Sequence, residues 1–402
     1  MPNTTITAPL GFLAAGVKCG IKRADAPDLA LLVCERPAAA AAVYTTNQVV
    51  AACMVHDRKI LPGGAGRLEA VVVNSGNANT CTGSKGLRDT LRMAELAGQS
   101  THCPANRVLV SSTGIIGRPL PMAKVEHGIL AAAASLGNSA EHGENFARAI
   151  MTTDTRLKLA FASLKLNGQT IKLAGCIKGS GMIAPRMATM LGYITTDADL
   201  SPALLHKALA QIAETTFNSI TVDGHTSTSD TVAVLASGLA GHTPIRKSGP
   251  AYAKFFAALR EVCYSLAEQV VRDGEGATKL VRVHVTGAAS EADAKAAARA
   301  IAESPLVKCA LNGGDPNWGR FISAAGYSTA RCNFNKMKCS VGKLVIFRSG
   351  QPTNVAESQV AKLMKADTVD LGVDLGAGHA STTMLTCDLS KEYVHINADY
   401  HT

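Results

Sequence analysis

Two apolar segments joined by an Asn-Gly pair constrain the fold more than any other part of this sequence. Residues 157–166 and 170–177 are rich in apolar side chains, and Asn167 and Gly168 stand between them. Asn-Gly is strongly preferred in two-residue hairpin turns, because both central residues of that turn need positive φ. The sequence therefore predicts an antiparallel hairpin, and hence a sheet in which these two strands are neighbours.

The other periodic segments predict strands and helices that alternate irregularly. Apolar runs that read as buried strands occupy residues 29–34, 40–44, 68–73, 107–111, 231–236 and 280–285. Helical spacing of apolar residues occurs at 84–98 (ending at Gly98), 121–136, 141–151, 201–216, 252–271, 291–303 and 356–366. Residues 325–348 read as strand-rich, and Tyr393–Asn397 read as extended. We predict a mixed α/β (α+β) fold of layered sheets and helices, not a strict βαβ winding.

Composition excludes several classes of protein. The chain has 402 residues and a net charge of +9, yet its basic residues form no run interleaved with aromatics, so we expect no nucleic-acid partner. No stretch of 18 apolar residues and no secretory leader occur, so we expect neither membrane spanning nor secretion. The 11 cysteines include no C-x-x-C pair, which favours a reducing cytoplasm and disfavours a metal site.

The segment from Lys178 to Asp199 is the strongest candidate for a functional site. It begins where the hairpin ends and holds small residues at 179–181, a proline at Pro185 and a hydroxyl at Thr189. Glycine lets backbone approach a ligand closely, and proline redirects the chain. Such a segment is too irregular for one helix or strand, so we interpret it as a site and not as scaffold.

Familiar ligand and hydrolase motifs do not explain the segment. Gly179, Gly181 and Ala184 formally match the dinucleotide fingerprint, but a strand-like run follows within two turns, where that motif needs a long helix. No Walker sequence is present. The polar loop 223–230 could be drawn as a Ser-His-Asp triad, but neighbouring residues on one loop rarely point at one another, so a hydrogen-bonded turn is preferred. We expect no cofactor.

Thr189 lies between Ala188 and Met190 in mostly apolar surroundings, and it is the candidate nucleophile. No partner base is evident in the sequence. If the peptide bond between Ala188 and Thr189 were cut, Thr189 would gain an α-amino group whose pKa suits proton transfer near neutral pH. The competing interpretation is a threonine that caps a turn, and the residues alone leave both open.

The chain resembles the ornithine acetyltransferase family, self-cleaving enzymes of arginine biosynthesis that are also called glutamate N-acetyltransferases. The resemblance covers essentially the whole length. The motifs that carry it are GFLAAGVKCGIK near the start, VVVNSGNANTCTG at 71–83, SSTGIIG at 111–117, MTTDT at 151–155, KGSGMIAPRMATML at 178–191, DGEGATK at 273–279, GGDPNWGR at 313–320 and the terminal YVHINADYHT.

The resemblance implies a mechanism and an assembly. Cleavage before Thr189 would give an α fragment of residues 1–188 and a β fragment of residues 189–402, with the active site between them and an α2β2 heterotetramer as the assembly. Thr189 would take acetyl from N2-acetylornithine and pass it to glutamate. Whether acetyl-CoA is also a donor stays open.

The resemblance also assigns roles to individual residues. The Thr113 hydroxyl and the Gly114 N–H would bind the oxyanion. Substrate contacts would come from Thr155, Lys178, Thr189, Glu275, Asn397 and Thr402. Two alternatives remain: an N-terminal-nucleophile amidohydrolase or aminopeptidase, which would pass the acyl group to water, and a binding protein of similar fold, which would stay uncut.

Overall fold

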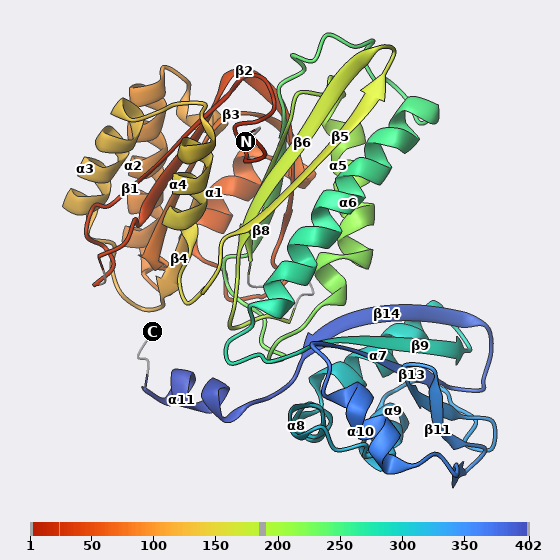
Figure 1. Cartoon of the computed structure of the whole chain (residues 1–402). Coiled ribbons are helices and arrows are strands. Elements are labelled where there is room, and N and C mark those ends of the chain that lie inside the picture. The colour runs from red at the N-terminus through yellow and green to blue at the C-terminus, as the bar shows by residue number, and fades with distance from the viewer. Residues whose placement is uncertain (1–2, 24, 185–189, 400–402) are drawn as a thin grey trace. The chain divides into compact units, whose positions relative to one another are not determined.

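The computed structural model describes residues 3–23, 25–184 and 190–399, and the chain divides into two compact units (Figure 1). The first unit holds the chain up to Asn218 together with His225–Val270. The second holds Ser219–Gly224 and the chain from Val271 onward. Both units combine a mixed sheet with helices, which confirms the predicted mixed α/β class.

Among the described residues, the sheet of the first unit has eight strands in the order β4-β3-β2-β8-β7-β6-β5, with β1 paired to β2. The pairs β3/β4 and β7/β8 are parallel and the other pairs are antiparallel. The strands are β1 Phe12–Val17, β2 Leu29–Tyr44, β3 Ala65–Asn77, β4 Val108–Ile115, β5 Lys158–Leu166, β6 Gln169–Lys178, β7 Leu191–Thr196 and β8 Thr231–Ala236.

The predicted hairpin is confirmed as β5 and β6. Leu166 pairs with Gln169 across the turn. Asn167 has φ 49° and Gly168 has φ 82°, the two positive values that a type I′ turn requires. The hairpin continues into the sheet through β6, which pairs with β7.

Strand β2 differs from the expectation of two separate strands. It runs unbroken from Leu29 to Tyr44, and the pairing with β3 shifts register between Val33 and Ala38. Pro37 sits in this bulge, where it needs no ladder partner for the N–H that it lacks. The proline therefore bends the strand without ending it.

Helices cover both faces of the strands β2, β3 and β4. The helices of this unit are α1 Ala52–Ile60, α2 Gly83–Thr101, α3 Met122–Ala134, α4 Ala140–Ile150, α5 Pro202–Thr215 and α6 Pro250–Arg272, with short 3-10 turns at Pro62–Gly64, Ala105–Arg107 and Phe217–Ser219. The predicted end of α2 is wrong. Gly98 is buried inside the helix, and His102 ends it in the left-handed conformation with φ 58°.

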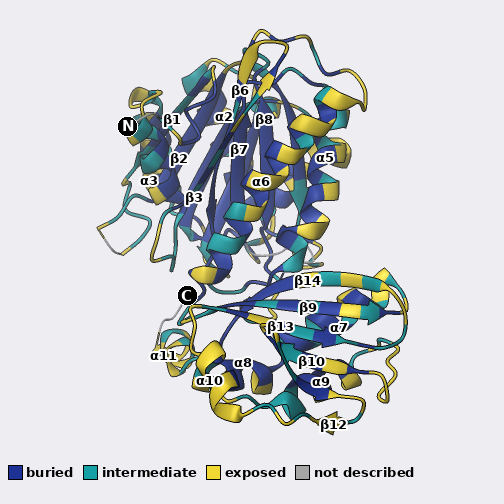
Figure 2. Ribbon diagram, turned by 45° about the vertical axis from the view of Figure 1, so that its right-hand side comes forward, coloured by how far each residue is buried: buried dark blue, intermediate teal, exposed yellow. Residues whose placement is uncertain are grey.

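Alternate residues of β2 enter two different cores. Figure 2 shows the central strands of this sheet in the colour of buried residues. Leu29 and Leu31 pack with side chains from α1, α2 and α3. Ala30 and Leu32 pack on the opposite face, with side chains from α4, β7 and β8. This period of two is what a strand buried on both faces requires.

In the described part of the second unit, a six-stranded sheet has the order β12-β11-β10-β13-β9-β14. Its strands are β9 Leu280–Ala288, β10 Lys338–Val341, β11 Leu344–Arg348, β12 Gln351–Pro352, β13 Thr368–Asp374 and β14 Ala380–Cys387. Its helices are α7 Glu291–Glu303, α8 Pro305–Gly313, α9 Trp318–Tyr327, α10 Glu357–Met364 and α11 Lys391–Asp399. Val281, Val283 and Val285 of β9 face a core to which α7, α8, α9 and α10 contribute.

Two expectations for the second unit are wrong. Residues 325–327 belong to helix α9, and the first strand of the region expected to be strand-rich begins only at Lys338. Tyr393–Asn397 lie in helix α11. Tyr-Val-His-Ile favours a strand by local propensity, but here the Asn397 side chain donates to the Tyr393 carbonyl one turn earlier, and the docked helix overrides that propensity. None of the helices in the described part is long and apolar enough to cross a membrane.

The close packing of α4 against β1 leads to a stability prediction. A Cβ added at Gly16 of β1 would lie 1.9 Å from the Asn145 carbonyl oxygen of α4, so Gly16→Ala forces the two elements apart. We expect a loss of about 2 kcal/mol in the free energy of unfolding, measured by urea denaturation. Gly249→Ala is the matched control, because its Cβ would meet nothing within 4 Å. Equal stability of the two variants would contradict this packing.

Candidate active site

Thr113 and Gly114 lie at the end of β4, where it runs beside β3. Gly114 pairs in register with Gly76 and has φ +129°. A Cβ added at Gly114 would come within 2.3 Å of the Gly76 carbonyl carbon, so only glycine fits beside the β3 backbone. The Thr-Gly pair to which the family resemblance gave the oxyanion role is therefore built by the close approach of two strands.

Lys178, the last residue of β6, reaches this pair. Its Nζ donates to Thr113 Oγ1 at 3.3 Å, and both side chains are buried. In the sheet order, β4 and β6 are separated by β3, β2, β8 and β7. The sheet is therefore so strongly twisted and bent that residues from distant strands meet at one place.

The contact determines which way the Thr113 hydroxyl donates. A lysine ammonium has donors and no acceptor, so Thr113 Oγ1 must be the acceptor in this bond. The hydroxyl hydrogen of Thr113 is then available to donate to a third group. With Lys178 as its donor, the Thr113 hydroxyl can itself act as a donor, which binding an oxyanion would require.

Asp154, next to Thr155 in the chain, anchors the other side of Lys178. Its fully buried carboxylate accepts from Lys158 Nζ at 2.6 Å and from the Gly179 N–H at 2.7 Å. Burial by itself raises the pKa of Asp154, but the cations of Lys158 and Lys178 and the Gly179 N–H outweigh it, so that the pKa falls to about 2. A permanent carboxylate therefore fixes the backbone directly after Lys178. Thr155 itself is exposed.

Lys22 adds a second amine to the same surroundings. Its stem lies against Gly76, where an added Cβ would be 3.1 Å from Lys22 Cγ, and its Nζ donates to the Pro27 carbonyl at 2.7 Å. Burial lowers the pKa of Lys22 to about 8, helped by the Lys178 cation and opposed by Asp28 and Asp154. Sequence reasoning missed Lys22, although the motif GFLAAGVKCGIK ends on it.

Ala188 and Thr189, the expected cleavage pair, and Thr402 lie outside the described residues. The described residues on either side of the expected cut, Ala184 and Met190, are buried. Met190 has its carbonyl bound by the Thr231 N–H at 3.0 Å, and Leu191 pairs in register with Lys178. The residues that follow Thr189 are thus held at the same end of β6 and β7 as Lys178.

In the second unit, Glu275 and Asn397 are brought together as partners. Asn397 Nδ2 donates to Glu275 Oε2 at 2.8 Å. The glycine beside Glu275 lets the loop approach α11: Gly276 has φ +67°, and an added Cβ would lie 2.5 Å from the Tyr393 N. Two residues that are 122 positions apart in sequence therefore share one hydrogen bond.

Asp388 organises the loop that carries Glu275, and sequence reasoning missed it. Its carboxylate accepts from the N–H and the hydroxyl of Thr278 and from the Lys279 N–H, at 2.8, 2.6 and 3.0 Å. It also accepts from Asn312 Nδ2 at 2.6 Å. The only signal in the sequence is an aspartate directly after a buried strand.

The segments that carry the rejected motifs have the following surroundings in the structure. The described residues 179–184 form no helix, which a dinucleotide fingerprint would require. In the loop 223–230, the Thr226 hydroxyl donates to the Ala184 carbonyl, and the Thr228 hydroxyl bonds the Thr80 hydroxyl at 3.0 Å. Within the loop itself, the Ser229 N–H donates to Ser227 Oγ at 3.3 Å, as a hydrogen-bonded turn requires. Within the described ranges, no group of three or more His, Cys, Asp or Glu side chains could hold a metal ion.

A Thr-Gly pair at a strand end beside a buried lysine places hydrogen-bond donors where acyl-transfer chemistry could use them. The chain is thus a mixed α/β protein with polar donors gathered at strand ends.

Comparison with known proteins identifies the family. Residues 13–402 match the ArgJ family. The chain is 48% identical over 399 residues to the arginine biosynthesis bifunctional protein ArgJ of Symbiobacterium thermophilum, which covers 99% of this chain and 98% of that protein. It is 44% identical over 398 residues to the protein of the same name from Geobacillus kaustophilus, covering 99% and 96%. A crystal structure of ArgJ from Bacillus halodurans is 45% identical with a TM-score of 0.51, and the match covers 53% of this chain and 100% of that one. The chain belongs to the ArgJ family.

The buried pair of Asp154 and Lys158 generates a prediction. Asp154→Asn leaves the Lys158 ammonium, whose side chain is 1% exposed, without its carboxylate. We expect the free energy of unfolding to fall by about 3 kcal/mol, measured by urea denaturation. The double variant Asp154→Asn/Lys158→Met removes both charges and should recover most of the loss. A double variant less stable than the single one would contradict a charge origin.

The stability of the same variants should depend on pH. The folded-state pKa of Asp154 is about 2, below its ordinary 3.8, so its stabilisation is complete above about pH 4 and is lost as the pH falls toward 2. The difference in stability between the wild type and Asp154→Asn should therefore shrink over that window. A difference that stays constant from pH 5 to pH 2 would count against the charged pair.

Proposed function

We propose that this chain is a glutamate N-acetyltransferase of arginine biosynthesis, which transfers acetyl from N2-acetylornithine to L-glutamate through an acetyl-Thr189 intermediate. Membership of the ArgJ family supports the activity, since its relatives are named as arginine biosynthesis proteins. The single observation that carries the chemistry is the contact between Lys178 Nζ and Thr113 Oγ1 beside Gly114. It presents two oriented donors at the end of the sheet where the residues after Thr189 begin β7.

The first half-reaction forms the acetyl ester. The Thr189 hydroxyl oxygen attacks the acetyl carbonyl while the Thr189 α-amine takes the hydroxyl proton. The Thr113 O–H and the Gly114 N–H donate to the resulting oxyanion, which is worth about 3 kcal/mol for each donor. The α-ammonium then protonates the departing nitrogen, the C–N bond breaks, and ornithine leaves.

The second half-reaction repeats these steps with glutamate. The glutamate α-amine attacks the ester carbonyl and loses a proton to the Thr189 α-amine, and collapse of the oxyanion returns the Thr189 hydroxyl. Lys178 is a suitable partner for a substrate carboxylate. Thr155, Glu275, Asn397 and Thr402 stay predictions as further substrate contacts, with Glu275 suited to an ammonium group.

Cleavage between Ala188 and Thr189 supplies the α-amine, and we propose residues 1–188 and 189–402 as the two fragments. The ladder between β6 and β7 would keep the fragments together after cleavage, because the strands lie on opposite sides of the cut. The solved relative from Bacillus halodurans supports this division: its whole chain corresponds to 53% of this one, the share that 214 of 402 residues make. An α2β2 heterotetramer in the cytoplasm, with the active site between the fragments, belongs to the same proposal. Use of acetyl-CoA as a second donor stays open.

The cleavage is tested by intact mass. The wild type should give two fragments of roughly 19 and 22 kDa by share of length, with Thr189 at the new N-terminus. Thr189→Ala should stay a single chain of 41.6 kDa, because it lacks the attacking hydroxyl. An uncut wild type would remove the α-amine from the mechanism and favour an uncut binding protein.

The acceptor separates a transferase from an N-terminal-nucleophile amidohydrolase or aminopeptidase. With N2-acetylornithine and glutamate, the cleaved enzyme should release ornithine and form N-acetylglutamate in equal amounts. Without glutamate, ornithine release should stop after about one equivalent per site, because the ester holds the acetyl group. Continued release of acetate at the same rate without glutamate would establish the hydrolase.

Thr113→Val should lower kcat about 100-fold in either case.

A further inference from the structure

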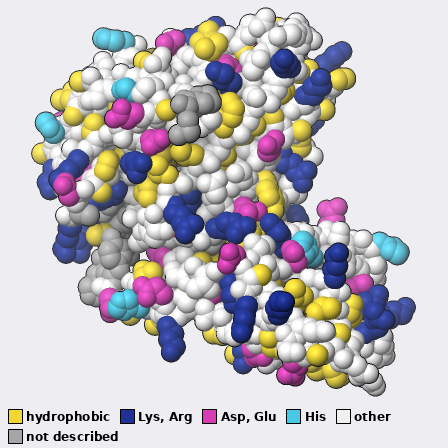
Figure 3. All heavy atoms as spheres, in the orientation of Figure 1, with side chains coloured by type: hydrophobic (Ala, Val, Ile, Leu, Met, Phe, Trp, Pro, Cys, Tyr) yellow, Lys and Arg dark blue, Asp and Glu magenta, His cyan; other side chains and the backbone are white. Residues whose placement is uncertain are grey.

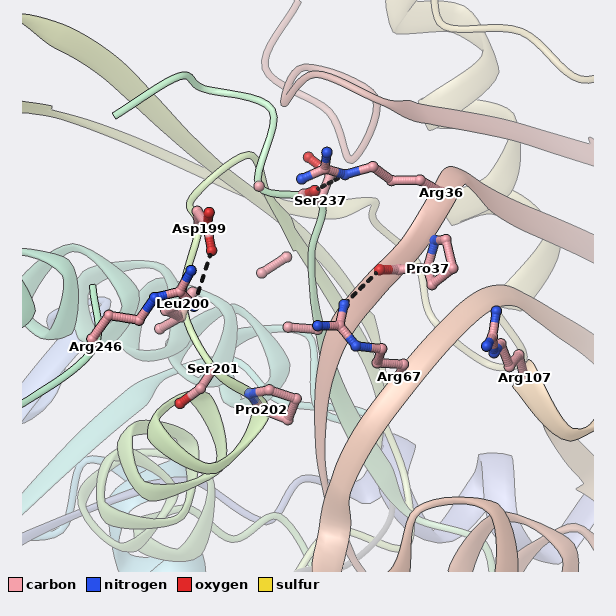
Figure 4. A pocket seen from close by; sticks show the side chains of 13 residues that line it. Arg36, Pro37, Arg67, Arg107, Asp199, Leu200, Ser201, Pro202, Ser237 and Arg246 are labelled. Carbon is pink, nitrogen blue, oxygen red and sulfur yellow. Dashed lines mark hydrogen bonds and ion pairs between the residues drawn. The ribbon is translucent and has the colours of Figure 1, made fainter. Parts of the chain in front are cut away.

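A cavity of about 560 Å³ lies in the first unit, away from the residues assigned to acetyl transfer (Figure 4). It opens where β7 and β8 end and α5 begins. Its lining includes Arg36, Arg67, Arg107, Asp199, Ser237 and Arg246. This volume is in the range of sites for small organic ligands.

Four arginines from four separate segments line this cavity. Arg36 comes from the bulge of β2, Arg67 from β3, Arg107 from the turn before β4, and Arg246 from the loop after β8. Figure 4 shows Arg36, Arg67 and Arg246 on different sides of one opening. On the face shown in Figure 3, by contrast, lysines and arginines are interspersed with acidic and apolar side chains.

Local carboxylates balance only part of this charge. Arg246 Nη1 lies 3.8 Å from Asp199 Oδ1, and Arg107 pairs with Glu69, which does not line the cavity. The Arg36 Nε–H donates to the Ser237 carbonyl at 2.6 Å and Arg67 Nη1 donates to the Pro37 carbonyl at 3.0 Å. Carbonyls orient a guanidinium without neutralising it. Two of the four cations thus have a carboxylate partner, while Arg36 and Arg67 are bonded to carbonyls, and an anion would relieve the remaining repulsion.

Two backbone features also favour an anionic ligand at this cavity. Helix α5 has 14 residues and begins at this cavity, with Ser201 as its N-cap and Pro202 as its first residue, so the positive end of its dipole is presented here. Gly238 has φ +72°, and an added Cβ would lie 2.6 Å from Arg36 Nη2. Glycine at this position leaves the space that the Arg36 guanidinium occupies.

The cavity lies at the opposite end of the strands from Lys178. In the β6/β7 ladder Lys178 pairs with Leu191, whereas Leu173 pairs with Thr196, just before the lining residues 199–202. Five strand steps separate Leu191 from Thr196, which is roughly 17 Å. The cavity is therefore a different place in the first unit from the candidate acetyl-transfer site.

We propose that this cavity binds a small phosphate-bearing anion with at least two negative charges. Planar guanidinium groups match phosphate oxygens in pairs, and several arginines converging from different directions suit a group with oxygens on several sides. The volume beyond one phosphate leaves room for a second phosphate or an organic body. This site lies away from Lys178 and is separate from the residues proposed to bind acetylornithine and glutamate.

The probe is inorganic pyrophosphate, titrated calorimetrically into the full-length protein at low ionic strength. The wild type should bind it with a 1:1 stoichiometry, and Arg36→Ala/Arg67→Ala should weaken binding at least about tenfold, since each lost charge-assisted contact is worth about that factor. Arg88→Ala/Arg348→Ala is the matched control: it removes two exposed arginines outside the cavity and should bind within about twofold of the wild type.

Further variants keep the proposal falsifiable. Arg36→Lys/Arg67→Lys retains the charge without the planar fork and should bind with intermediate affinity, while thermal unfolding without ligand checks that each variant is folded. Thr189→Ala should bind pyrophosphate as the wild type does, so this test is separate from the acetyl-transfer proposal. Absence of binding in the wild type, equal weakening in the control pair, or citrate binding as tightly as pyrophosphate would overturn the proposal.

Discussion

The structure of the first unit depends on β2, because this one strand completes the hydrogen bonding of three others. Its residues pair with β1 and β3 before the bulge and with β3 and β8 after it. Backbone N–H and C=O groups in a buried sheet must be paired, so a break in β2 would leave several strands unsatisfied at once. The bulge at Pro37 accommodates the proline on this strand without interrupting it.

The bending of the sheet explains how the candidate site is assembled. Thr113 and Lys178 end strands that are far apart in the sheet order, yet their side chains meet at 3.3 Å. The carboxylate of Asp154 then holds Gly179 in place through its buried oxygen, and the Lys158 ammonium keeps that carboxylate charged. A site made of strand ends therefore derives its precision from sheet geometry and from one buried ion pair.

Local signals predicted the elements well where they were strong. The Asn167–Gly168 turn and β8 appeared as expected, because turn chemistry and apolar runs are local properties. The failures share one cause, which is tertiary contact that overrides local preference. Gly98 is buried within α2 instead of ending it, and Tyr393–Asn397 form a helix that docks on the Gly276 loop.

By itself, the sequence determined the mixed α/β class, the family resemblance and the residue types at the site, since motifs and periodicity are written along the chain. Only the tertiary structure decided that Lys178 orients Thr113, that Asp154 rather than a surface carboxylate fixes the segment after Lys178, and that Asp388 holds the loop of Glu275. It also brought Arg36, Arg67, Arg107 and Arg246 around one cavity. Each of these contacts joins distant positions, and a sequence pattern carries no distance between residues until the sheet has set it.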